Sequence, residues 1–314
     1  MHEVRSVPSE ASAANRPLAR LSGASKRYGA VQALDNVDLV IRPAEVLALL
    51  GPNGAGKTTA LGLLTGALRA DRGQVSLFDG SPLNWRVRRR IGVMQQSADL
   101  PETLTVAEHV RQFSGYYPQP RALAQTLELA GISELAGRRY DALSGGQQRR
   151  VQFALAICGN PPLLFIDEPT VGLDVESRRA FWRVIAQLRS AGTSIVLTTH
   201  YLEEADVLAD RIVLMAAGRV LAEDTPAGIK SRAAGKRVRF SSNMDASLLA
   251  SWPEVSSVTQ DANVIELRTP SAEALLRRLL AADTQLADLE VLPLSLEEAF
   301  VTLTAAPRAA HQLV

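Results

Sequence analysis

The chain has 314 residues, 46% of them hydrophobic and 21% charged, and its formal net charge at pH 7 is +1. This composition is ordinary for a protein with a sizeable core, the length suggests about two domains, and the balanced charge argues against a nucleic-acid partner. Residues 1–18 lack the apolar stretch of a signal peptide, and no window approaches the roughly 18 consecutive apolar residues of a membrane helix. We therefore expect a soluble chain in a reducing compartment, with its single cysteine, Cys158, in the core.

The first part of the chain predicts strands and turns. Between Ala19 and Ile41, two short extended segments flank KRYGAVQALDN, whose polar and glycine residues favour turns. From Glu45 to His200, short apolar runs alternate with longer helical stretches, which is typical of parallel strands buried on both faces. These runs are Val46–Leu50, Leu163–Ile166 and Ser194–Thr198. The pattern predicts an α/β fold preceded by a small β element.

Two further regions have their own patterns. The stretch Thr105–Cys158 has helical periodicity, so we expect an inserted helical subdomain over about residues 100–160. After Pro226 the composition changes, and Lys236–Thr304 alternates short strand and helix patterns, which predicts a small α+β domain. The predicted boundaries are 1–18 for a disordered N-terminus, 19–230 for the main domain, 231–306 for the accessory domain and 307–314 for a flexible tail.

A phosphate-binding loop is predicted at GPNGAGKTT, which fits G-x-x-x-x-G-K-[ST] between the apolar strand VLALL and a helical run. Glycines let successive N–H groups point inward, and the following helix presents its positive end to phosphate. We expect Lys57 to reach the β and γ phosphates and Thr58 to supply a hydroxyl to Mg²⁺. The nucleotide-binding residues predicted from the loop are Gly51, Asn53, Gly54, Ala55, Gly56, Lys57, Thr58 and Thr59.

An acidic pair follows the apolar run LLFI. Asp167 and Glu168 end this strand at the carboxyl edge, where α/β sheets bind ligands. Successive strand residues point to opposite faces, so the two carboxylates have different roles unless the chain bends. We assign Asp167 to the Mg²⁺ shell and Glu168 to polarising the water that attacks a phosphate.

The segment LSGGQQRR, beginning at Leu143, resembles the LSGGQ signature of ABC ATPases. A serine and two glycines opening a helix (Gln147–Cys158) make a second anion-binding helix terminus. Together with the loop and the acidic strand, this motif makes the chain similar to ATP-binding subunits of ABC transporters over roughly residues 21–226. The resemblance implies a P-loop NTPase fold with an antiparallel β subdomain, ATP and Mg²⁺ as ligands, and two chains that sandwich two ATP molecules head to tail. The residues that would complete the partner's site are Ser144, Gly145, Gly146 and Gln147.

Several single residues outside these motifs also resemble positions of the family. Tyr28 resembles the aromatic residue that stacks on adenine, and Gln96 resembles the glutamine that senses Mg²⁺ and water, with Gln95 as the alternative in register. Asp174 resembles a residue that contacts the other subunit, and it also suits a helix N-cap. His200 occupies the position of the γ-phosphate switch histidine. The resemblance assigns catalysis to Lys57, Gln96, Glu168 and His200, and Mg²⁺ to Thr58, Gln96 and Asp167.

Two positions depart from the family pattern. Ala44 stands where relatives usually have glycine, so its turn either avoids φ > 0 or is strained. Val171 stands where a small residue is common. Neither departure removes a catalytic group, so a competent ATPase is expected.

The ending LSLEEAFVTLT, Leu294–Thr304, resembles the tail of ATPases from ABC-2-type exporters, which include the daunorubicin-resistance subunits. The alternative is an amphipathic helix that only packs the accessory domain. The resemblance implies an exporter ATPase that pairs as a homodimer, joins an integral membrane permease and lies in the cytoplasm on the inner face of the membrane. We expect the accessory domain to strengthen or regulate the pairing.

Two rival functions are weaker. A soluble ABC ATPase acting on nucleic acid or the ribosome is disfavoured because the chain has no long coiled coil, second cassette or strong positive charge. A binding module without catalysis is disfavoured by the intact Lys57, Asp167, Glu168 and His200. The resemblance implies that the membrane subunit is the main site of substrate recognition, so these motifs do not identify the transported substrate.

Overall fold

The computed structural model describes residues 16–96, 99–233 and 235–305. The chain divides into two compact units, Met1–Thr225 and Pro226–Val314. The predicted domain boundary after residue 230 falls inside helix α9 (Pro226–Arg232) of the second unit. The predicted tail 307–314 and most of the predicted N-terminal segment 1–18 lie outside the described residues. Within the described part of the chain, no helix combines the length and apolarity needed to cross a membrane.

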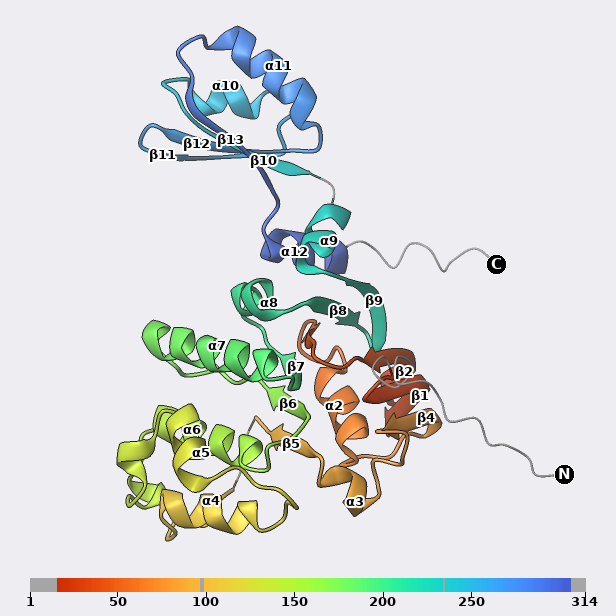
Figure 1. The fold of residues 1–314 in the computed structure, drawn as a ribbon. Coiled ribbons are helices and arrows are strands. Elements are labelled where there is room, and N and C mark those ends of the chain that lie inside the picture. The colour runs from red at the N-terminus through yellow and green to blue at the C-terminus, as the bar shows by residue number, and fades with distance from the viewer. Residues whose placement is uncertain (1–15, 97–98, 234, 306–314) are drawn as a thin grey trace, which may run out of the picture. The chain divides into compact units, whose positions relative to one another are not determined.

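The first unit is built on a six-stranded sheet of order β5-β6-β7-β3-β8-β9 (Figure 1). Its strands are β3 (Val46–Leu50), β5 (Ile91–Met94), β6 (Leu163–Asp167), β7 (Ser194–Thr198), β8 (Arg211–Ala216) and β9 (Arg219–Asp224). Neighbouring strands from β5 to β8 are parallel, and β9 is antiparallel to β8. All residues of β3, β6 and β7 are buried, which explains their continuous apolar sequence. The predicted α/β class is confirmed, and the carboxyl ends of β5, β6, β7 and β3 are neighbours at one edge.

A second sheet of the first unit is antiparallel and has the order β2-β1-β4. Its strands are β1 (Ala19–Tyr28), β2 (Val31–Ile41) and β4 (Arg72–Leu77). The expectation of two short segments around a turn-rich KRYGAVQALDN was wrong, because the strands continue until Tyr28 pairs with Val31. Polar residues can extend these strands because β1 also pairs with β4 on its other side, which satisfies both edges of its backbone.

The turn before β3 contains a left-handed alanine. Ala44 has φ = 54°, so this turn follows the strained alternative of the two considered from the sequence. Its N–H donates to Ser194 Oγ at 2.7 Å, a bond that helps hold the turn against β7. A glycine at this position would relieve the strain.

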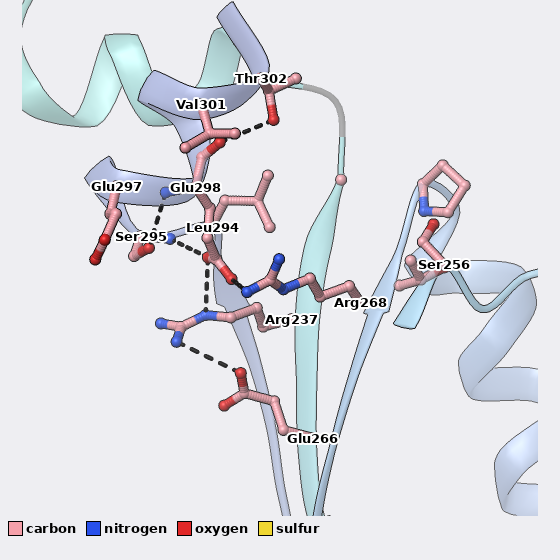
Figure 2. Close-up of a pocket in the computed structure, with 13 residues that line it drawn as sticks. Arg237, Ser256, Glu266, Arg268, Leu294, Ser295, Glu297, Glu298, Val301 and Thr302 are labelled. Atoms are coloured by element: carbon pink, nitrogen blue, oxygen red, sulfur yellow. Dashed lines mark hydrogen bonds and ion pairs between the residues drawn. The ribbon is translucent and has the colours of Figure 1, made fainter. Parts of the chain in front are cut away.

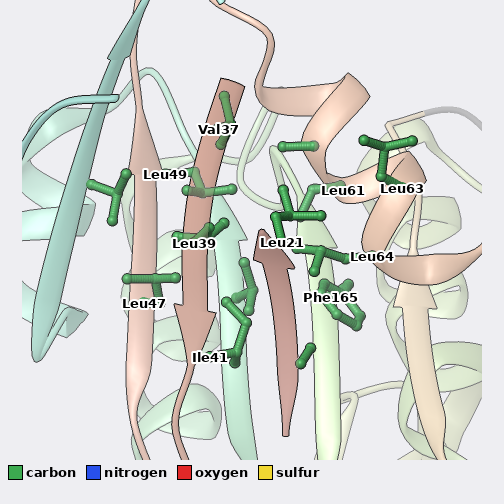
Figure 3. Packing of buried hydrophobic residues seen from close by; sticks show 14 of the residues in the cluster. Leu21, Val37, Leu39, Ile41, Leu47, Leu49, Leu61, Leu63, Leu64 and Phe165 are labelled. Carbon is green, nitrogen blue, oxygen red and sulfur yellow. The ribbon is translucent and has the colours of Figure 1, made fainter. Parts of the chain in front are cut away.

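The main core lies between the two sheets and helix α2 (Lys57–Thr65). Figure 3 shows core members from β1, β2, β3, α2 and β6, among them Leu21, Leu39, Leu49, Leu64 and Phe165. Complete burial of one such side chain stabilises the fold by roughly 1.5–3 kcal/mol relative to exposure. This packing gives α2, and the loop in front of it, a rigid base.

The helical region lies between β5 and β6 in the sequence. Its helices are α4 (Val106–Ser114), α5 (Leu123–Leu129) and α6 (Gly145–Ile157), with single 3₁₀ turns at Ser133–Leu135 and Tyr140–Ala142. Helix α6 packs against β5, and α4 and α5 pack against α6, as Figure 1 shows. Cys158, directly after α6, is buried. The described residues of this unit also form helices α3 (Trp85–Arg88), α7 (Val175–Ser190) and α8 (Leu202–Leu208).

A buried carboxyl on α8 predicts a pH-dependent stability. Glu204 is fully buried and accepts hydrogen bonds from Trp182 Nε1 at 3.2 Å and Thr170 Oγ1 at 3.3 Å. Burial raises the pKa of Glu204 above its ordinary value, although these hydrogen bonds oppose the shift. At pH values between the pKa of Glu204 in the unfolded chain and its raised pKa in the folded chain, the folded chain binds more protons than the unfolded chain. The free energy of unfolding therefore falls as the pH rises through this range.

We therefore expect Glu204→Gln to raise the melting temperature at pH 7. The gain should shrink as the pH is lowered and disappear below the unfolded pKa of about 4.3, where the glutamate is protonated in both states. Thermal unfolding of the native chain and of Glu204→Gln across this pH range measures the difference in melting temperature. A gain that does not change with pH would contradict the assignment.

The second unit is a four-stranded antiparallel sheet of order β11-β12-β10-β13. Its strands are β10 (Lys236–Ser241), β11 (Ser257–Asp261), β12 (Val264–Thr269) and β13 (Ala287–Pro293). Helices α10 (Ala246–Ala250) and α11 (Ala272–Ala282) lie on one side of this sheet (Figure 1). Its separate core includes Phe240 and Leu267 from the sheet and Leu275 from α11. Helix α12 (Leu296–Ala305), which carries the LSLEEAF motif, packs against α9.

A cavity of about 760 Å³ in the second unit is lined by β10, β12 and the start of α12 (Figure 2). Glu298 lies in its wall, with Oε1 2.5 Å from Arg268 Nη2 and Oε2 3.7 Å from Arg237 Nε. Its Oε2 also accepts the Ser295 N–H at 2.7 Å, and Ser295 Oγ accepts the Glu298 N–H at 3.2 Å. This reciprocal capping box begins α12 and joins it to the sheet.

Glu298→Ala is expected to destabilise α12 by about 1 kcal/mol, because it removes the side-chain acceptor of the Ser295 N–H and the ion pairs, although Ser295 Oγ still caps the helix. Amide hydrogen exchange in α12 should become roughly fivefold faster. Glu297→Ala is the matched control, because Glu297 is an exposed neighbour in the same helical turn. Equal exchange rates in the two variants would contradict a specific role of Glu298.

Candidate nucleotide-binding site

The predicted phosphate loop lies between β3 and α2, where close packing requires glycine. Gly56 is the N-cap of α2 and has φ = 102°. A Cβ on Gly56 would lie 2.5 Å from the carbonyl oxygen of Ala33, and one on Gly51 would lie 2.3 Å from that of Met215. The loop is therefore enclosed between β2 and β8, directly before the N-terminus of α2, where close packing leaves no room for a Cβ.

Lys57 lies in the first turn of α2 and is 8% exposed. Its Nζ donates to the carbonyl oxygens of Gly51 at 2.7 Å and Pro52 at 3.2 Å. Burial lowers the pKa of Lys57, whereas the negative charges of Glu168 and Asp167 act in the opposite direction. The loop thus holds a buried cation in the field of the two carboxylates, a suitable arrangement for binding phosphate.

Asp167 ends β6 and is 8% exposed. Thr198, at the end of β7, donates its hydroxyl hydrogen bond to Asp167 Oδ1. Asp167 Oδ2 lies 3.5 Å from Thr58 Oγ1. Mg²⁺ prefers such oxygen ligands and usually completes its shell with substrate phosphates and water, so these residues fit a magnesium ion.

Glu168 bends away from the strand with φ = 48°. Its N–H donates to the carbonyl oxygen and the hydroxyl oxygen of Thr198, each at 3.1 Å. Its Oε2 accepts a hydrogen bond from Gln96 Nε2 at 3.3 Å and lies 3.4 Å from His200 Nδ1. A left-handed non-glycine residue is strained, and such strain concentrates at functional sites. The bend sends the two adjacent carboxylates to different partners.

Of the two adjacent glutamines, Gln96 bonds to the Glu168 carboxylate, whereas Gln95 contributes its carbonyl oxygen to Arg149. Tyr28 lies at the end of β1, is 47% exposed and has Lys26 Nζ 5.7 Å from its ring centroid. Asn53, Gly54 and Ala55 lie in the connection between β3 and α2, and Thr59 lies in the first turn of α2 together with Lys57.

The signature segment begins α6. Ser144 is the N-cap, and the helix starts at Gly145, two residues before the predicted start at Gln147. The earlier start follows from a capping box, in which the Ser144 N–H donates to Gln147 Oε1 at 3.0 Å and the Gln147 N–H donates to Ser144 Oγ at 3.4 Å. A Cβ on Gly146 would lie 3.6 Å from the Leu173 side chain, which places the segment beside the loop before α7.

Asp174 caps α7. Its two carboxylate oxygens accept the backbone N–H and the hydroxyl of Ser177, each at 2.8 Å. These bonds lower the pKa of Asp174 below its ordinary value, the backbone bond most strongly. The capping role considered from the sequence is therefore present, and the exposed loop before it remains accessible.

Two residues of the site were missed from the sequence. Thr198 bonds to Asp167 and to the Glu168 main chain, and the only sequence signal was that the β7 run ends in threonines. Arg149 donates to main-chain carbonyls after β5 and β6, and no local pattern separates it from Arg150. Such partners are visible only when the sheet order is known.

Comparisons with known proteins identify the family of the chain. A family model described as ABC transporter matches residues 34–171. The daunorubicin resistance ATP-binding protein DrrA2 of Streptomyces coeruleorubidus is 40% identical over 227 residues, 70% of each chain. DrrA3 of the same organism, also named for daunorubicin resistance, is 35% identical over 301 residues, 90% of this chain and 95% of that protein. A solved dimeric ATP-binding cassette in a post-hydrolysis state with ADP and Pi bound is 27% identical, with a TM-score of 0.61, and covers 66% of this chain and 98% of that chain.

The enclosed phosphate loop and the two strand-end carboxylates define an ATPase of the P-loop class. The chain belongs to the ATP-binding subunits of ABC transporters, and it binds and hydrolyses ATP. The predicted resemblance to daunorubicin-resistance ATPases is confirmed.

Proposed function

We propose that the chain powers an exporter as a head-to-tail homodimer, with two ATP molecules and two Mg²⁺ ions between the protomers. The observation that carries the catalytic part is the Glu168 carboxylate, which lies between Gln96 and His200. The same edge of the sheet holds Lys57 and the Thr58–Asp167 pair. A water oriented by Glu168 would therefore attack a phosphate held by Lys57.

The proposed roles follow from the chemistry of the side chains. Glu168 accepts the proton of the attacking water, and Gln96 and His200 hold this carboxylate in place. Lys57 and the loop amides stabilise the charge that develops on the transferred phosphoryl group. Thr58 and Asp167 hold Mg²⁺, which when bound neutralises phosphate charge. Tyr28 is proposed to stack on the adenine ring.

Pairing is proposed from the start of α6. Ser144 and the first-turn residues Gly145, Gly146 and Gln147 present a capped helix N-terminus, which favours an anion. The matching cassette with ADP and Pi is dimeric, which supports a paired assembly. In this arrangement Ser144 of one protomer would face the triphosphate held by Lys57 of the other, with Asp174 near the same interface.

We propose a separate permease subunit as the partner and the inner face of the membrane as the location. A cavity of about 310 Å³ lies between α2 and the end of β5, lined partly by Leu61, Leu68 and Val93. Gln96 and Asp167 line the same cavity, so a permease segment inserted there would touch the loop that holds Glu168. Export is proposed because the matching relatives are named for daunorubicin resistance.

Co-expression with a candidate permease, chosen by examining the genes that neighbour the one for this chain, tests the partnership. We expect the two to co-purify, and ATP hydrolysis by the complex to require Mg²⁺. Leu68→Glu, which puts a charge in the apolar cavity wall, should release the permease while leaving nucleotide binding intact. Co-purification that is unaffected by this change would contradict docking at the cavity.

A further inference from the structure

Arg149 of α6 is 8% exposed, and its guanidinium group is directed at main-chain carbonyls. Nη1 donates to the carbonyl oxygens of Gln95 and Gln96, each at 2.8 Å. Nη2 donates to those of Asp167 and Glu168, each at 2.6 Å. One planar group therefore joins the segment after β5 to the segment after β6, both within the catalytic edge of the sheet.

This arrangement is not an ion pair. Across the described residues, no carboxylate oxygen lies within ion-pair distance of Arg149, although the negative charges of Asp167 and Glu168 oppose the effect of burial on its pKa, and its one side-chain hydrogen-bond partner is Gln152 Oε1 at 2.9 Å. Its Nε is buried and lacks a hydrogen-bond partner, and burial lowers its pKa. Burying a cation and leaving one of its donors unpaired costs free energy. This cost suggests that Arg149 has a functional role beyond stabilising the helix.

We propose that Arg149 is a positioning residue for ATP hydrolysis. The carbonyls that it holds belong to the same residues whose side chains form the Gln96–Glu168 hydrogen bond, so it fixes both ends of that bond. It acts through Glu168 and not by contact with the nucleotide. The inference rests on the proposed roles of Glu168 and Gln96.

The position of Arg149 in the fold gives this contact a second consequence. Helix α6 begins at Ser144, so one rigid helix carries both the signature end and the guanidinium that holds Glu168. A movement of α6 relative to the sheet would change the Glu168 geometry in the same chain. A misplacement of about 1 Å can cost roughly 10²-fold in rate.

The test compares Arg149→Met, Arg149→Lys and Arg150→Met in the full chain. Arg150 is a matched control on the same helix, because it donates to the Gly131 carbonyl at 3.2 Å and to Ser177 Oγ at 3.0 Å. We expect Arg149→Met to lower kcat by about 30- to 100-fold, with KM and the Kd of a fluorescent ATP analogue changed less than about threefold. Arg149→Lys should recover part of kcat, and Arg150→Met should keep kcat within about threefold.

Unchanged kcat in Arg149→Met would overturn the inference. If that variant does not fold, Arg149→Lys decides, because unchanged kcat there would overturn it equally. Glu168→Gln is measured in parallel to separate the inference from the proposed function. Full turnover in Glu168→Gln would contradict the proposed role of Glu168. An inactive Glu168→Gln together with a fully active Arg149→Met would contradict only the role of Arg149.

Discussion

Replacing Glu168 with glutamine is expected to lower the turnover number for ATP by about 10²–10⁴-fold while ATP binding persists. The amide has nearly the same shape as the carboxylate but cannot accept the proton of the attacking water at neutral pH. Lys57 and the loop amides are untouched, so the affinity for ATP should change little. A chain that binds ATP without hydrolysing it should accumulate as an ATP-bound dimer.

Phosphate release and size-exclusion chromatography measure these two effects. Glu134→Gln is a matched control, because Glu134 is an exposed glutamate in a 3₁₀ turn of the helical region. The control should keep its turnover within about twofold, as expected for an exposed position. Turnover retained in Glu168→Gln would contradict its role as the proton acceptor.

Replacing Lys57 with methionine is expected to reduce kcat/KM by about 10²–10³-fold. The substitution keeps the length and apolar stem of the side chain but removes the buried ammonium that lies within the phosphate loop. The loss should appear in ATP affinity as well as in kcat, because the charge faces phosphate both before and during the reaction.

Isothermal titration with ATP and steady-state kinetics separate the two contributions. Lys236→Met is the control for loss of a lysine charge, because Lys236 belongs to the second unit and forms an exposed pair with Glu273 at 3.3 Å. That variant should bind ATP like the native chain. Equal affinities of Lys57→Met and the native chain would be inconsistent with the proposed phosphate contact.

Much of the site could be predicted because its residues lie in short, ordered motifs at strand ends. The phosphate loop and the acidic pair each follow an apolar strand, and parallel strands bring their carboxyl ends to one edge. The sequence also raised the question of how Asp167 and Glu168 could act differently, and the left-handed Glu168 supplies the bend. Confirmation of the ATPase itself came from the relatives and not from the geometry alone.

Other features depend on long-range packing and could not be predicted from the sequence. Arg149 and Thr198 act through main-chain and hydroxyl contacts with segments far along the chain, which no local pattern encodes. The β8–β9 hairpin was also missed, although Ala217 and Gly218, both with φ > 0, form the kind of turn that joins such strands. Strands β1 and β2 were underestimated because pairing with neighbours overrides the turn preference of their polar residues.

Mixing two inactive variants tests the shared site most directly. Lys57→Met disables the phosphate loop, and Gly145→Asp puts a negative charge at the start of α6, where an added Cβ meets no atom within 4 Å in the chain itself. Head-to-tail pairing leaves one intact site in each mixed dimer, so an equimolar mixture should recover about a quarter of native ATPase sites. A mixture as inactive as its components would show that Lys57 and the signature segment do not act on the same ATP from opposite protomers.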